Sequence, residues 1–188
     1  MQNRAHLTSL PNLLTYGRIV AIPLVIYLIA TGYPGLRWLA FVLYAAAAFT
    51  DWLDGYLARK WNQSSPLGRM LDPIADKLLV GALIVIFAWD GTLTPLDLVP
   101  AIAILLREIF VSGLREFMGT TSVIVPVSKL AKWKTTVQLV AIGALFIVPF
   151  LAGIGLLASA LLWLAAVLTV WTGAQYFMAA WPHLSGEK

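Results

Sequence analysis

The sequence has no cysteine and very little charge. Without cysteine, the chain can form no disulfide and carry out no thiolate chemistry. Only 12% of its residues are charged and 60% are hydrophobic, whereas a soluble domain has about 25% charged residues. Long apolar runs with so few charges indicate an integral membrane protein. The length suits one membrane domain over residues 1–188, because each spanning helix takes roughly 20 residues.

The apolar runs are continuous and rich in Leu, Ala, Val and Ile. They do not alternate as the strands of a membrane β-barrel would, so helices are expected. Segments rich in Gly, Pro, Asn and Ser separate the runs. We therefore predict an all-α integral membrane protein with six transmembrane helices, at residues 10–31, 36–60, 68–89, 97–118, 130–151 and 155–181.

The basic residues of the predicted loops and helix ends fall mainly on one side of the membrane. The side that holds the N-terminus carries Arg4, Arg59, Lys60, Arg69, Arg115, Lys129, Lys132, Lys134 and Lys188. The opposite side carries only Arg37. Because cytoplasmic segments are enriched in Lys and Arg, both termini are expected to be cytoplasmic.

A polar stretch at 51–76 interrupts this apolar chain. It holds Asp51, Asp54, Asp72 and Asp76, four of the nine acidic residues. The members of each pair are three or four residues apart, so each pair lies on one helix face. The spans at 36–60 and 68–89 form a hairpin, in which these two faces can oppose each other at one depth near the cytoplasmic side.

Four carboxylates in a partly desolvated site must become protonated, pair with cations or bind metal. Divalent cations prefer carboxylate oxygens, and two metals suit phosphoryl chemistry. Arg59 lies near the helix end, where it can contact a phosphate. Alternatively, each Asp pairs with a nearby basic residue, for which Arg59, Lys60, Arg69 and Lys77 are available. The cost of an intramembrane Asp favours the functional reading.

The pattern Asp51-x₂-Asp54-Gly55-x₂-Ala58-Arg59-x₈-Gly68-x₃-Asp72-x₃-Asp76 resembles the signature of the CDP-alcohol phosphotransferase family, with every fixed position matched. The resemblance implies a six-helix membrane fold, usually dimeric, and transfer from a CDP-linked donor to an alcohol with release of CMP. It also implies two divalent ions, Mg²⁺ or Mn²⁺. Asp51 and Asp72 would bridge both ions, Asp54 would complete one site and Asp76 the other.

The resemblance also implies further roles. Asp76 would be the general base on the acceptor hydroxyl, beside the catalytic Asp72. The CDP pocket would be formed by Asp54, Gly55, Ala58, Arg59 and Gly68. We further expect Asn12, Thr15 and Arg18, at the start of the first span, to face the donor phosphates; a helix-start cap is the alternative.

Other stretches, at 10–18, 72–77, 107–116 and 132–135, are similar to family members that use sn-glycerol 3-phosphate as acceptor. This resemblance implies that CDP-diacylglycerol is the donor. It also implies an enzyme of phospholipid biosynthesis in the bacterial cytoplasmic membrane, with its active site facing the cytoplasm. The expected partners are these two substrates, the lipid bilayer and a second copy of the chain, with no nucleic acid.

Four basic residues indicate an anionic acceptor. Arg107 and Arg115 are eight apart on broadly one helix face, and Lys132 and Lys134 lie near the start of the next span. A deep arginine is costly unless it lines a polar cavity, and such a group suits an acceptor phosphate. Glu108 and Glu116 would orient the arginines. Alternatively, Arg107 pairs with one of these glutamates and the lysines only mark the cytoplasmic side.

Two other functions fit parts of this pattern. A member of the same family could use another acceptor: inositol phosphate, serine or phosphatidylglycerol. A cation transporter could use intramembrane carboxylates, but it would carry them near the midplane of several helices, often with repeat symmetry. Here the acids cluster at one face and no repeat is visible, and the glycines and Ala58-Arg59 also favour the CDP-dependent family over other Asp-dependent membrane transferases such as prenyltransferases.

Overall fold

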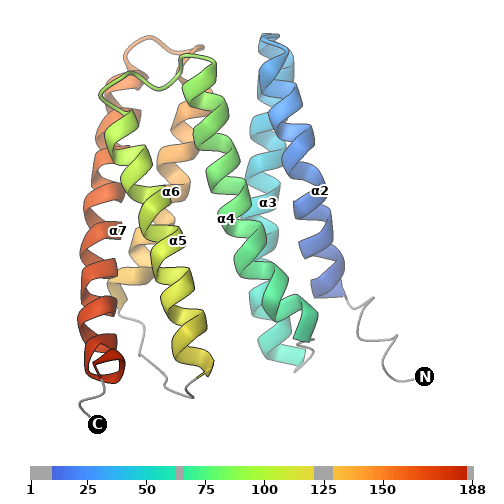
Figure 1. Cartoon of the computed structure of the whole chain (residues 1–188). Coiled ribbons are helices and arrows are strands. Elements are labelled where there is room, and N and C mark those ends of the chain that lie inside the picture. Colours follow the sequence, from blue (N-terminus) through green and yellow to red (C-terminus); the bar gives the residue numbers. More distant parts are fainter. Residues whose placement is uncertain (1–9, 62–65, 121–128, 186–188) are drawn as a thin grey trace. The chain divides into compact units, whose positions relative to one another are not determined.

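The computed structural model describes residues 10–61, 66–120 and 129–185, and the regular structure in these ranges is all helical (Figure 1). The helices are α2 (Leu10–Ala30), α3 (Pro34–Trp61), α4 (Pro66–Trp89), α5 (Leu98–Thr120), α6 (Lys129–Ile147) and α7 (Ile154–Leu184). Each overlaps one predicted span, so the prediction of an all-α chain is confirmed in these ranges.

Prolines explain the main differences between the predicted and observed helix ends. Pro34 and Pro66 are the first residues of α3 and α4, two residues before the predicted spans begin. The fixed φ of proline suits the first helical position, where an amide hydrogen would have no partner in the helix. α6 ends at Ile147 instead of near residue 151, because Pro149 lacks an amide hydrogen and disfavours a helical conformation at Val148.

The described residues form two compact units, which divide between Asp90 and Gly91. In the first unit, α2 packs against both α3 and α4. Its core contains Val25 of α2 and Phe87 of α4. The Arg37 Nη1 lies 2.5 Å from an Asp90 carboxylate oxygen, and its guanidinium carbon lies 5.3 Å from the centre of the Phe87 ring. This ion pair joins the first turn of α3 to the residue that follows α4.

In the second unit, α7 packs against both α5 and α6. Ile104, Leu145 and Leu162 contribute one buried side chain from each helix. Just before α5, the Asp97 carboxylate accepts hydrogen bonds from the Thr94 hydroxyl, at 2.6 Å, and from the Ser159 hydroxyl of α7. The start of α5 is therefore tied to α7.

Two of the described helices are long and apolar enough to cross a membrane: residues 12–30 of α2, and α7. In the most apolar 18-residue stretch of each helix, only 33% and 28% of the residues are buried in the structure. The core helix of a soluble protein would be mostly buried. Large apolar side chains such as Val20 and Leu156 are 71% and 82% exposed. These helices indicate a membrane protein, while the other four spans remain a prediction.

Candidate functional site

Three polar side chains lie on one buried face of α2. Asn12, Thr15 and Arg18 are each three residues apart, a spacing that places them on one side of the helix. Their exposed fractions are only 2%, 1% and 3%. A buried arginine requires compensating partners, and its partners come from the two helices against which α2 packs.

Arg18 connects two of the predicted metal-binding carboxylates. Its Nη1 donates hydrogen bonds to Oδ1 of Asp51, at 2.7 Å, and to Oδ1 of Asp76, at 2.8 Å. Asp51 comes from α3 and Asp76 from α4. The two Asp side chains remain 40% and 50% exposed, whereas that of Arg18 is 1% exposed. The structure therefore brings these two carboxylates together around the Arg18 guanidinium. The helical spacing of the acidic residues did not predict this pairing with Arg18.

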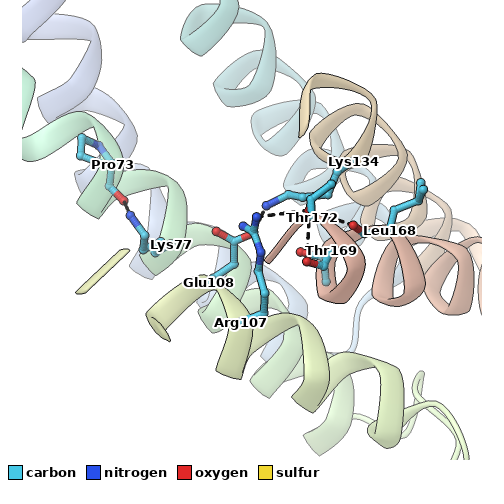
Figure 2. A network of polar contacts seen from close by, with 8 residues as sticks. All are labelled: Pro73, Lys77, Arg107, Glu108, Lys134, Leu168, Thr169 and Thr172. Atoms are coloured by element: carbon cyan, nitrogen blue, oxygen red, sulfur yellow. Dashed lines mark hydrogen bonds and ion pairs between the residues drawn. The ribbon is translucent and has the colours of Figure 1, made fainter. Parts of the chain in front are cut away.

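Asp72 is connected to the same helix. Its Oδ1 accepts a hydrogen bond from the Thr15 hydroxyl of α2. Gly68, one turn earlier on α4, is buried. One turn later, the Lys77 ammonium donates a hydrogen bond of 2.7 Å to the Pro73 carbonyl (Figure 2). Thus α2 contacts one predicted carboxylate through Thr15 and two through Arg18.

Four residues of the predicted donor site lie in α3, but their side chains fall outside the described part of the chain: Asp54, Gly55, Ala58 and Arg59. Among the described residues, no group of three His, Cys, Asp or Glu side chains gathers to hold a metal. The donor chemistry nevertheless fits a divalent cation, since Asp51, Asp72 and Asp76 all offer carboxylate oxygens. The position of Arg18 shows that a positive charge is accommodated between two of them.

A second polar cluster lies in the other unit, where side chains of α5, α6 and α7 point toward one another (Figure 2). The Lys134 ammonium of α6 donates to Oε1 of Glu108 on α5. The Arg107 Nη1 donates to the same oxygen at 3.3 Å, and its Nη2 donates at 3.3 Å to the Thr172 hydroxyl oxygen of α7. Two of the four predicted acceptor residues, Arg107 and Lys134, therefore meet at one glutamate.

Of the other two predicted acceptor residues, only Arg115 has a side chain that the structure describes. The Arg115 guanidinium carbon lies 5.9 Å from the centre of the Tyr176 ring, in a cation–π contact, and its side chain is exposed. The side chain of Lys132 lies outside the described residues. Glu108 contacts Arg107 as expected. The same contact is also the ion pair that the alternative explanation of Arg107 predicts.

Besides Lys134, α6 and α7 contribute three buried polar residues that the sequence did not predict. Gln138, Thr169 and Thr172 are 5%, 0% and 4% exposed. Gln138 follows Lys134 by one helical turn, which is the only signal that the sequence offers for it. Threonines in an apolar helix can simply bond to their own backbone, as Thr172 does to the Leu168 and Thr169 carbonyls. Its contact with Arg107 could not be read from the sequence.

Comparison with known proteins identifies the family. The sequence model for CDP-alcohol phosphatidyltransferases matches residues 8–171. A protein of Cereibacter sphaeroides is 41% identical over 96% of this chain and 99% of its own length. Proteins of Rickettsia bellii and Escherichia coli are 45% and 43% identical, over 91% and 92% of this chain and 94% of their own lengths. All three are named CDP-diacylglycerol–glycerol-3-phosphate 3-phosphatidyltransferase. The chain therefore belongs to the CDP-alcohol phosphatidyltransferase family.

Proposed function

We propose that the protein is a phosphatidylglycerophosphate synthase. It transfers the phosphatidyl group of CDP-diacylglycerol to sn-glycerol 3-phosphate and releases CMP. The similarity of 41% and 45% to relatives with this named activity supports the proposal. The structural observation that carries it is the meeting of Asp51 and Asp76, from two different helices, at one nitrogen of Arg18.

The residues that we assign to the donor lie in the first unit. Asp51, Asp54, Asp72 and Asp76 would hold two divalent ions, Mg²⁺ or Mn²⁺, which when bound neutralise charge on the diphosphate and on the departing CMP. The CDP pocket is formed by Gly55, Ala58, Arg59 and Gly68, with Asn12, Thr15 and Arg18 toward the phosphates. Asp76 accepts the proton of the acceptor hydroxyl.

The residues that we assign to the acceptor phosphate lie in the second unit. Arg107 and Lys134 share the single carboxylate of Glu108, so these three groups together keep a positive charge that suits a phosphate monoester. Glu108 holds the two cations in place before the acceptor arrives. In this proposal Arg115 and Lys132 also contribute positive charge for the acceptor phosphate.

The setting follows from the same proposal. The six helices span the bacterial cytoplasmic membrane with both termini and the active site on the cytoplasmic side, and two copies of the chain form a dimer. Residues 1–188 act as one domain. The match of the family's sequence model to residues 8–171, which runs through the boundary between the units, supports this view.

The proposed activity is tested with purified protein, labelled CDP-diacylglycerol, Mg²⁺ and a panel of acceptors. We expect CMP release with sn-glycerol 3-phosphate, and much less with inositol phosphate, serine or phosphatidylglycerol. If one of these three replaces glycerol phosphate as the best acceptor, the acceptor assignment is wrong although the family assignment stands. No CMP release with any acceptor would contradict the enzymatic proposal.

Replacement of Asp76 tests the catalytic assignment. Asp76→Asn keeps the size of the side chain but removes its ability to take a proton, so CMP release should fall by about 10²–10⁴-fold. Asp90→Asn is the matched control, since it makes the same change in the ion pair with Arg37 and should leave the activity of the folded protein unchanged. Full activity of Asp76→Asn would remove its role as the base.

A further inference from the structure

The stem of Arg107 lies directly on the backbone of α7 at a glycine. A Cβ atom at Gly173 would stand 2.9 Å from Arg107 Cγ and 3.1 Å from its Nε. Contacts of a Cβ below 3.0 Å are essentially absent from real structures. Because glycine has no Cβ, it allows this close approach of a side chain to a helix backbone. Any other residue at this position would occupy the place of the Arg107 stem.

A Cβ atom at position 173 would displace the part of Arg107 that carries the guanidinium, and it would also touch a second side chain. Its Cγ belongs to the base of the side chain, so a shift there carries the whole guanidinium with it. Val111 lies one turn further along α5, and its Cγ2 is 3.5 Å from the same Cβ position. On α7, the neighbouring Thr172 accepts the hydrogen bond from Arg107 Nη2. Adjacent residues of α7 thus fix the stem and the tip of one arginine.

We infer that Gly173 and Thr172 are positioning residues that hold the Arg107 guanidinium where the acceptor phosphate binds. This inference rests on the proposed function. Both residues lie just beyond residues 8–171, the stretch that the family's sequence model matches. Glu108 holds Arg107 from within α5, and the α7 pair holds it from the facing helix, so the cation is positioned from both sides.

The first test compares two glycine substitutions. Gly173→Ala should raise the KM for sn-glycerol 3-phosphate by about tenfold, or ~1.4 kcal/mol, and leave the KM for CDP-diacylglycerol unchanged. Gly113→Ala is the matched control, since a Cβ there meets nothing within 4 Å. Both changes add the same methyl group and raise helix propensity. Equal kinetic constants for the two variants would overturn the inference.

A double-mutant cycle separates the positioning role from the acceptor assignment. Alanine at position 107 has no Cγ or Nε, so in the Arg107→Ala background Gly173→Ala should leave the KM unchanged and should not lower the Tm, which the gain in helix propensity can only raise. With Arg107 present, the same substitution should raise the KM and lower the Tm by several degrees. If Gly173→Ala changed the KM and the Tm by the same amount with and without Arg107, the inference would be overturned. If Arg107→Ala left the KM for glycerol phosphate unchanged, the acceptor assignment would fall, while the Tm cycle would still test the packing.

The Thr172 hydroxyl is tested by a pair of conservative variants. Thr172→Val keeps the shape of the side chain but removes the acceptor of the Arg107 hydrogen bond, so the KM for sn-glycerol 3-phosphate should rise several-fold. Thr172→Ser keeps the hydroxyl and should restore a KM close to that of the unmodified protein. Equal KM values for the two variants would remove Thr172 from the inference.

Discussion

Arg18 has an environment that is demanding for an arginine in an apolar chain. Its side chain is 1% exposed, and one of its nitrogens binds carboxylates from two other helices. A buried guanidinium is tolerated only when hydrogen-bonded negative groups compensate its lost hydration. The two half-exposed carboxylates provide that compensation. Arg18 in turn reduces the repulsion between Asp51 and Asp76, so the three side chains stabilise one another.

Removal of this charge should destabilise the protein in a way that Mg²⁺ partly reverses. Arg18→Gln leaves the two carboxylates facing each other, so the free energy of unfolding in metal-free detergent solution should fall by about 1–3 kcal/mol. A divalent cation can take over the compensating role, so part of the lost Tm should return when Mg²⁺ is added.

The control for Arg18 is Arg37→Gln, which removes a buried arginine from an ion pair in the same unit. Its Tm deficit should not depend on Mg²⁺, because Arg37 has no part in the carboxylate cluster. If both variants responded to Mg²⁺ to the same extent, the carboxylates around Arg18 would not be a cation site.

The residues differ in how far their roles could be predicted. Helical spacing within α3 and α4 indicated that Asp51 and Asp76 could meet, because that prediction needs only the geometry of a hairpin. The pairing with Arg18 depends on how α2 packs against both helices, which no local pattern encodes. Gly173 is an extreme case: nothing around it in the sequence distinguishes it from a glycine in open space, and its significance arises only from Arg107 on another helix.

At the level of helices, hydrophobic runs predicted the existence and order of the elements, since each helix presents a long apolar stretch. The ends were less accurate because proline acts differently by position. At Pro34 and Pro66 it starts a helix, whereas at Pro149 it follows the end of one. An apolar pattern does not distinguish these roles. At the first position of a helix the missing amide hydrogen of proline costs nothing, whereas further along the chain proline disfavours a helical conformation at the residue before it.

The start of α5 provides a prediction about pH. Burial acts to raise the pKa of the Asp97 carboxyl, but hydrogen bonds from Ser159 and Thr94 outweigh it and hold this pKa below its ordinary value. A lowered pKa in the folded protein adds stability above the ordinary aspartate pKa of about 3.9, and this stability is lost as the pH falls through the lowered pKa.

Ser159→Ala should therefore reduce the free energy of unfolding by about 1–3 kcal/mol at pH 7, because it removes a hydrogen bond to a charged group. The difference from the unmodified protein should shrink as the pH falls below about 4. Thermal unfolding in detergent over this pH range measures it, with Ser112→Ala in α5 as the control. A deficit that is independent of pH would show that the Asp97 charge is not involved.

For the whole molecule, the proposed chemistry divides between the two units. The first holds the acidic cluster around Arg18, and the second holds the basic cluster around Glu108. This division fits the two proposed substrates, since metal ions on the carboxylates would bind the diphosphate of the donor and the basic residues would bind the phosphate of the acceptor. A match of one family model to residues 8–171 supports their action as one enzyme.

The absence of cysteine allows the membrane orientation to be tested at single positions. Leu96→Cys places a thiol at a residue that is 66% exposed, in the segment between α4 and α5, and Ser185→Cys places one just after α7. Because the basic residues predict cytoplasmic termini, a membrane-impermeant maleimide should label Leu96→Cys in intact cells and Ser185→Cys only after lysis. The opposite result would reverse the orientation. Labelling of both thiols from one side would contradict three membrane crossings by α5, α6 and α7.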